Sequence, residues 1–113
     1  MKRELNLFIR DILRSIELIE SYIGNTTKDK FNIDTKLQDS VVRRLEIIGE
    51  AVKNIPNSLK EKYPEISWKE VAGLRDIMIH TYFNVDLNIV WEIIKKDLPK
   101  FGKGVRKIGL NRL

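Results

Sequence analysis

Residues 73–86 read GLRDIMIHTYFNVD and hold the only histidine of the chain, His80, five residues after Arg75 and two before Tyr82. An arginine, an imidazole and a phenol thus stand within eight positions of one another. We predict that this stretch is the end of one helix followed by a short polar connector. The rest of the chain is read outward from it.

The helix that enters this stretch is predicted to span residues 68–80. Ser67 and Glu70 have the spacing of a capping box at its start. Its expected apolar side consists of Val71, Leu74, Ile77 and Met78. After the connector, Asp86 is a suitable N-cap for a helix at about 87–98, which we expect Pro99 to end.

Helical geometry limits how the polar residues of the stretch can cooperate. At 100° per residue, Arg75 and Tyr82 lie within about 20° of each other, whereas His80 is about 140° from Arg75 and about 40° from Asp76. Arg75 and His80 therefore do not converge on one small atom within a regular helix. Either the helix loosens at His80, or a phosphate-sized group spans the two residues, or a second copy of the chain completes the site.

Two long amphipathic helices are predicted before this region. Residues 4–24 carry isoleucine and leucine at spacings of three and four and end at Gly24. A polar connector follows, and Asp34 is a plausible N-cap for a second helix that stops at Pro56. Its expected buried residues are Leu37, Val41, Leu45, Ile48, Val52 and Ile55. With a helical turn after Pro56 and no sustained strand alternation, the prediction is an all-α bundle of four or five helices.

A polar stripe runs along the second long helix. Arg43, Glu46, Glu50 and Lys53 follow one another at spacings of three, four and three, so they share one face. This face is either a solvated surface with ion pairs, or the source of an acid, Glu46 or Glu50, that orients Arg75 or His80. Gly49 costs a helix about 1 kcal/mol relative to alanine, which favours a close approach of another helix there.

Length and charge indicate one small domain, residues 1–113, with a basic C-terminal tail at about 100–113. The net charge is +5, and residues 100–113 hold five basic side chains and no acidic one. The remaining 99 residues carry 16 basic and 16 acidic groups. The tail is either a contact for an anionic partner such as RNA, or a solvated chain end.

Other classes of protein fit the composition poorly. No apolar run approaches the length of about 20 residues that a membrane span requires, and the N-terminus lacks a signal-peptide profile, so we expect a cytoplasmic protein. One histidine and no cysteine cannot form a nitrogen and sulfur zinc site within one chain. No D-x-D or H-x-x-x-H array suggests a two-metal nuclease. We expect no metal and no cofactor.

The motif R-x-x-x-x-H-x-Y, formed here by Arg75, His80 and Tyr82, resembles that of the HepT-like ribonuclease toxins of the HEPN superfamily. The likeness extends over VVRRLEIIGEAVKNIP (41–56), KYPEISWKEVAGLRDIMIHTYFNVD (62–86) and VWEIIKKDLP (90–99), in the family's order. The resemblance implies a HEPN-like fold, a two-fold homodimer and the toxin role in a type II toxin–antitoxin system. It also implies an RNA endonuclease whose site is shared between the two chains.

The residues suit metal-independent cleavage of RNA, in which the ribose 2′-OH is the nucleophile. An imidazole with a pKa of about 6.5 can accept or donate a proton at neutral pH. The guanidinium of Arg75 can hold the phosphate and offset the charge that develops on its oxygens. Transesterification benefits from both a base and an acid, and a dimer supplies two copies of His80.

The resemblance also assigns a regulatory role to Tyr82. In HepT-like toxins the motif tyrosine receives AMP from an antitoxin of the MNT type, a minimal nucleotidyltransferase. Tyr82 is otherwise an aromatic residue that packs at the helix end. Asp76 has two readings, one in which it orients His80 and one in which it pairs with Arg75. The alternative function is a non-catalytic HEPN scaffold or substrate-binding subunit for a nucleotidyltransferase.

Overall fold

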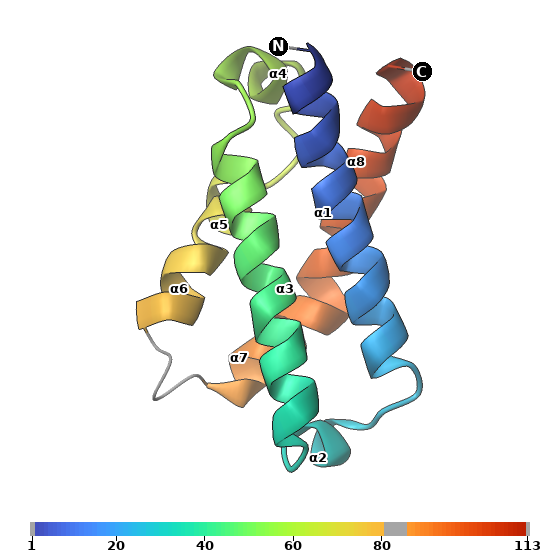
Figure 1. The fold of residues 1–113 in the computed structure, drawn as a ribbon, viewed down its shortest axis with the longest axis vertical. Helices are drawn as coiled ribbons and strands as arrows, with labels where there is room; N and C mark the ends of the chain where they lie inside the picture. The colour runs from blue at the N-terminus through green and yellow to red at the C-terminus, as the bar shows by residue number, and fades with distance from the viewer. Residues whose placement is uncertain (1, 81–85, 113) are drawn as a thin grey trace.

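The computed structural model describes the backbone of residues 2–80 and 86–112, and the side chains of residues 5–78 and 86–108. These residues form the helices α1 (Lys2–Ile23), α2 (Lys28–Phe31), α3 (Thr35–Lys53), α4 (Asn57–Lys62), α5 (Trp68–Ala72), α6 (Leu74–His80), α7 (Leu87–Glu92), the π-helix η2 (Ile93–Asp97) and α8 (Leu98–Arg112). No strand occurs in the described ranges, so the all-α prediction is confirmed. The helices pack together as one bundle (Figure 1).

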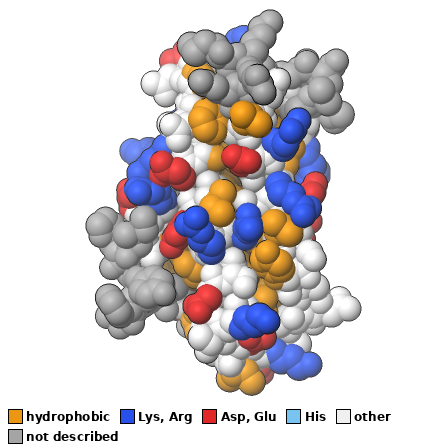
Figure 2. Space-filling view, viewed as in Figure 1, with side chains coloured by type: hydrophobic (Ala, Val, Ile, Leu, Met, Phe, Trp, Pro, Cys, Tyr) orange, Lys and Arg blue, Asp and Glu red, His pale blue; other side chains and the backbone are white. Residues whose placement is uncertain are grey.

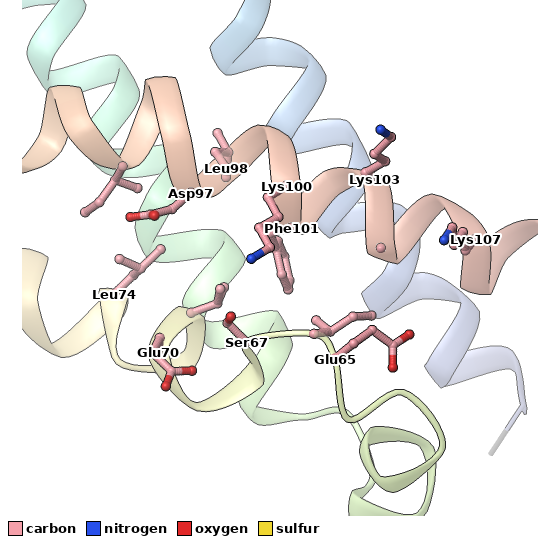
Figure 3. Close-up of a pocket in the computed structure, with 14 residues that line it drawn as sticks. Glu65, Ser67, Glu70, Leu74, Asp97, Leu98, Lys100, Phe101, Lys103 and Lys107 are labelled. Carbon is pink, nitrogen blue, oxygen red and sulfur yellow. The ribbon is translucent and has the colours of Figure 1, made fainter.

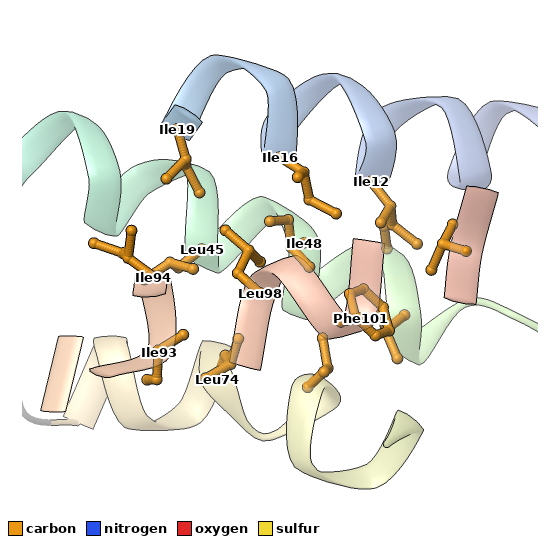
Figure 4. Packing of buried hydrophobic residues seen from close by; sticks show 14 of the residues in the cluster. Ile12, Ile16, Ile19, Leu45, Ile48, Leu74, Ile93, Ile94, Leu98 and Phe101 are labelled. Carbon is orange, nitrogen blue, oxygen red and sulfur yellow. The ribbon is translucent and has the colours of Figure 1, made fainter. Parts of the chain in front are cut away.

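The long helices α1, α3 and α8 run lengthwise through the molecule, with α5 and α6 against α3 (Figure 1). One apolar core joins them, and Figure 4 shows α1 and α3 facing residues of α6, η2 and α8. The fully or almost fully buried side chains include Ile12, Ile16, Ile19, Val41, Leu45, Ile48, Val52, Met78, Val90, Leu98, Val105 and Ile108. Their spacing of three and four within each helix is the pattern that predicted the bundle.

Two of the predicted helix starts are confirmed by their hydrogen bonds. The Asp34 carboxylate accepts a bond of 3.0 Å from the backbone N–H of Leu37, and Asp86 accepts one of 2.9 Å from Asn88. At the end of α1, Gly24 has a φ of +48°, which a residue with a side chain rarely adopts. Each of these features depends on residues close together in the sequence, so the sequence alone can predict it.

The capping box predicted at Ser67 is wrong. The Ser67 side chain makes no capping hydrogen bond at the start of α5. The turn is held instead by the Trp68 indole, which donates a bond of 3.0 Å to the carbonyl oxygen of Tyr63. A buried tryptophan has a polar group to satisfy, and its bond sets the direction in which the chain enters the helix.

The helix predicted at 68–80 consists of α5 and α6, with Gly73 between them in a right-handed helical conformation. Val71, Leu74 and Met78 are buried as expected. The prediction that Ile77 lies on the apolar side is wrong, because its side chain is 42% exposed. Ile77 precedes the buried Met78 by one position, which is about 100° around the helix, and so faces outward.

Pro99 does not end the last helical segment, so that prediction is wrong. Before it, η2 forms a wide π-helical turn in which the Leu98 N–H bonds to the carbonyl oxygen of Ile93. Pro99 then occupies the first turn of α8, where proline's missing N–H is tolerated. The basic segment at 100–113 is therefore largely helical, and Phe101, Val105 and Ile108 anchor it in the core.

The connector after α1 contains one residue that the periodicity did not identify as core. Phe31 ends the short helix α2, which Thr27 caps, and its side chain is fully buried. Its ring centroid lies 5.4 Å from that of Trp91 on α7. A single aromatic residue in a polar segment has no neighbours of its kind to reveal a pattern, and its contact is distant in the sequence.

Charges of both signs are interspersed over the face that α1 and α3 present in Figure 2. Salt bridges between exposed side chains of the molecule include those of Arg14 with Glu17 and of Arg106 with Glu20. This face is therefore not a uniformly basic surface. In the described part of the chain, no helix combines the length and apolarity needed to cross a membrane.

Candidate active site

The site is built where α6 crosses α3. A side-chain carbon added to Gly49 of α3 would lie 2.8 Å from the backbone nitrogen of Arg75 and 3.0 Å from its Cβ. Only glycine leaves room for this approach, as predicted for Gly49. The close contact brings the last two turns of α3 within reach of the Arg75 side chain.

Arg75 is held by carboxylates of two helices. Its Nε atom lies 2.6 Å from the Oε2 atom of Glu50 on α3, and its Nη1 atom lies 3.9 Å from the Oδ1 atom of Asp76. The Arg75 side chain is 40% exposed, so its outer edge still faces solvent. A guanidinium that is paired with carboxylates and still partly exposed keeps a defined position and can bind an anion from solvent.

The two glutamates of the polar stripe have different partners. Glu50 pairs with Arg75, whereas Glu46 lies 3.4 Å from Arg43 on its own helix. The structure thus brings Glu50 to Arg75, whereas the predicted role of either glutamate toward His80 lies outside the described side chains. Asp76 contacts both Arg75 and Lys53, whose Nζ atom is 3.4 Å from Asp76 Oδ1.

His80 is the last residue of α6, and its side chain is outside the described part of the structure. Tyr82 also lies outside the described residues. Since α6 is one α-helix from Leu74, the backbones of Arg75 and His80 are separated by about 7.5 Å along the axis and about 140° around it. The roles of His80 and Tyr82 stay predictions.

Lys53 was predicted only as a member of the polar stripe on α3 and not as a residue of the candidate site. It belongs to the last turn of α3 and meets Asp76 across the helix contact. The available signal was its spacing of three from Glu50, which places both on one face. Among the described residues, no group of three or more histidine, cysteine, aspartate or glutamate side chains is arranged to hold a metal ion.

A cavity of about 390 Å³ lies on another side of α5 and α6, between them and α8. Its walls are formed by apolar residues such as Ile66, Leu74 and Phe101, with Glu70 and Lys100 from opposite sides (Figure 3). Of the predicted site residues whose side chains the structure describes (Arg75, Asp76, Glu46 and Glu50), none lines it. The candidate site is therefore the surface at the α3–α6 crossing and not this cavity.

The fold is a small all-helical bundle with the Arg75 cluster at the α3–α6 crossing, and similarity to known proteins gives the family. A family model described as "Ribonuclease HepT-like" matches residues 12–108. The chain belongs to the HepT-like ribonuclease family. No solved structure matches the chain.

Several archaeal relatives cover almost the whole chain. It is 50% identical over 108 residues to a "Gamma-glutamylcyclotransferase and putative RNase" of Methanocaldococcus jannaschii, a match covering 96% of this chain and 49% of that protein. The chain thus spans about half the length of that relative. It is 48% identical over 99 residues to a "Probable ribonuclease HepT" of Thermococcus cleftensis, covering 88% of this chain and 90% of the relative.

Proposed function

We propose that this protein is the ribonuclease toxin of a HepT/MNT toxin–antitoxin system and cleaves RNA without a metal ion. The observation that carries the proposal is the Arg75 guanidinium on α6, the helix that also contains the only histidine of the sequence, held at 2.6 Å by Glu50 of α3. The names of the relatives, among them a probable ribonuclease HepT, agree with RNA as the substrate. Arg75 and His80 are the proposed catalytic residues.

The proposed reaction is an in-line transesterification. His80 accepts the proton of the ribose 2′-OH, and the 2′-oxygen forms a bond to the phosphorus while the bond to the 5′-oxygen breaks. The leaving 5′-oxygen takes a proton from an imidazolium, which a second His80 can supply. Arg75 binds the phosphate and offsets the charge on its non-bridging oxygens. The products are a 2′,3′-cyclic phosphate and a free 5′-hydroxyl.

The purified protein is expected to cleave labelled single-stranded RNA in the presence of EDTA, because every proton transfer uses a side chain. Mass spectrometry of the fragments should find 2′,3′-cyclic phosphate or 3′-phosphate ends. RNA in which the 2′-hydroxyls are methylated is the control and should remain intact. Absence of cleavage under all conditions would favour the alternative function, a scaffold for a nucleotidyltransferase, and 5′-phosphate products would contradict the mechanism.

The proposal includes a two-fold dimer in which both copies of His80 face one groove. One histidine per chain cannot act as base and acid at the same moment, and α6 separates its Arg75 and His80 by about 140°. Sedimentation should therefore give a dimer, and a crystal structure should place the two His80 side chains toward each other. Two His80 side chains on opposite outer faces of every dimer would exclude the composite site.

We further propose that Tyr82 is a regulatory residue, modified with AMP by an MNT-type nucleotidyltransferase antitoxin. In the sequence, Tyr82 comes two residues after the end of α6, the helix that holds Arg75. An adenylyl phosphodiester close to Arg75 would compete with the RNA phosphate for the guanidinium. The adenosine would add bulk at the entrance to the site.

Incubation with an MNT-type partner, ATP and magnesium is expected to add AMP to Tyr82 and to stop RNA cleavage. Intact-mass and peptide mass spectrometry locate the modification. Tyr82→Phe removes the acceptor hydroxyl, so this variant should escape modification and continue to cleave RNA. AMP on another residue, or full modification with unchanged cleavage, would contradict the regulatory role.

A further inference from the structure

One carboxylate oxygen at the α3–α6 crossing lies between two cations. The Oδ1 atom of Asp76 is 3.4 Å from Lys53 Nζ and 3.9 Å from Arg75 Nη1. Lys53 comes from the last turn of α3, whereas Arg75 and Asp76 come from α6. Two positive groups of different helices thus approach one anionic oxygen.

The three side chains are accessible to solvent, and Arg75 is already held in position. The side chains of Lys53 and Arg75 are each 40% exposed, and that of Asp76 is 55% exposed. Glu50 holds Arg75 by the Nε atom at 2.6 Å, which leaves the outer guanidinium nitrogens for another partner. Gly49 brings the backbones of the two helices together, and Lys53 Nζ and Arg75 Nη1 approach the same oxygen of Asp76.

We infer that Lys53 and Arg75 form a two-cation binding site for a phosphate of the RNA and that Asp76 Oδ1 occupies this site when no RNA is bound. The inference deepens the proposed function, since the ligand is the phosphodiester of its substrate. A phosphate oxygen replaces the Asp76 carboxylate between Lys53 Nζ and Arg75 Nη1. Arginine contributes a planar fork, and lysine contributes a compact charge that follows the phosphate.

The acidic neighbours then have separate roles. Glu50 is a positioning residue, because it contacts the inner Nε atom and fixes the direction of the guanidinium. Asp76 is a placeholder that balances the two cations and has to move when the phosphate enters. The opposite reading is that Lys53 and Asp76 form a surface ion pair that contributes little and never meets substrate.

The test measures binding of a fluorescent single-stranded RNA to the full-length protein at several KCl concentrations, in a His80→Ala background that prevents cleavage. Lys53→Ala is expected to weaken binding about fivefold at 0.1 M salt and to flatten the salt slope by about 0.7, the value for one lost phosphate contact on a single strand. Lys53→Arg should retain the slope. Lys36→Ala, at an exposed lysine in the first turn of α3, is the matched control and should change neither value.

Asp76→Asn in the same background isolates the placeholder role, because any effect of Asp76 on His80 is absent there. It is expected to tighten RNA binding severalfold, since the competing carboxylate is removed. Circular dichroism confirms that each variant is folded. An unchanged slope in Lys53→Ala, or weaker binding by Asp76→Asn, would overturn the inference. Both readouts are binding measurements, so they remain decisive even if the wild-type protein proves not to cleave RNA.

Discussion

His80→Ala is expected to lower the rate of RNA cleavage by about 10²- to 10⁴-fold while the protein stays folded. This range is the usual contribution of a general acid–base residue. Arg75→Ala should lower the rate by about 10²- to 10³-fold, because charge on the phosphoryl oxygens is no longer offset. Cleavage of labelled RNA under single-turnover conditions measures both effects, and expression in a growth assay should show loss of toxicity.

The stability of the two variants separates catalysis from structure. The Arg75–Glu50 pair is 40% and 54% exposed, and partly exposed ion pairs contribute about 0–1 kcal/mol to the free energy of unfolding. Thermal unfolding of Arg75→Ala should therefore be close to that of the wild type. Arg14→Ala, which breaks an exposed ion pair within α1, a helix without predicted site residues, is the control and should retain full activity. A folded His80→Ala or Arg75→Ala variant with normal cleavage would remove that residue from the mechanism.

Most of the bundle was predictable because its signals are local. Helix starts at Asp34 and Asp86 and the end of α1 at Gly24 depend on bonds or dihedrals within a few residues. Features set by contacts distant in the sequence were missed, such as the burial of Phe31 against Trp91. The prediction that Pro99 ends a helix was wrong because the π-helical turn before it shifts the backbone hydrogen bonds. No residue pattern predicts such a turn.

In the candidate site, too, local sequence signals predict some residues, and contacts between distant segments determine others. Glu46 and Glu50 lie four residues apart on one face of α3, and helical periodicity treats them alike. Which of them meets Arg75 depends on the position of α6 along α3, and the contact at Gly49 sets that position. The motif therefore predicts Arg75 and His80 as site residues, whereas the contacts of Glu50 and Lys53 with α6 emerge only from the packing of two helices.

Gly49→Ala is expected to destabilise the fold and to impair cleavage together. The new Cβ would lie 2.8 Å from the backbone nitrogen of Arg75, so one helix has to shift. Such overpacking costs about 1–3 kcal/mol of unfolding free energy, against a gain of about 1 kcal/mol in helix propensity. The shift moves Arg75 itself, and a misplacement of about 1 Å in an active site can cost about 10²-fold in rate.

Gly73→Ala is the matched control, because a Cβ there meets only carbonyl oxygens at 3.4 and 3.5 Å and the backbone is already helical. Both substitutions gain similar helix propensity, so the difference between their unfolding free energies isolates the contact at Arg75. That difference should be about 1–3 kcal/mol, with about 4–8 °C in melting temperature for each kcal/mol in a domain of this size. Since the closest atom belongs to the backbone, the double variant Gly49→Ala/Arg75→Ala should be no more stable than Gly49→Ala. Recovery of stability in the double variant would mean that the arginine side chain, and not the approach of the two backbones, requires glycine at position 49.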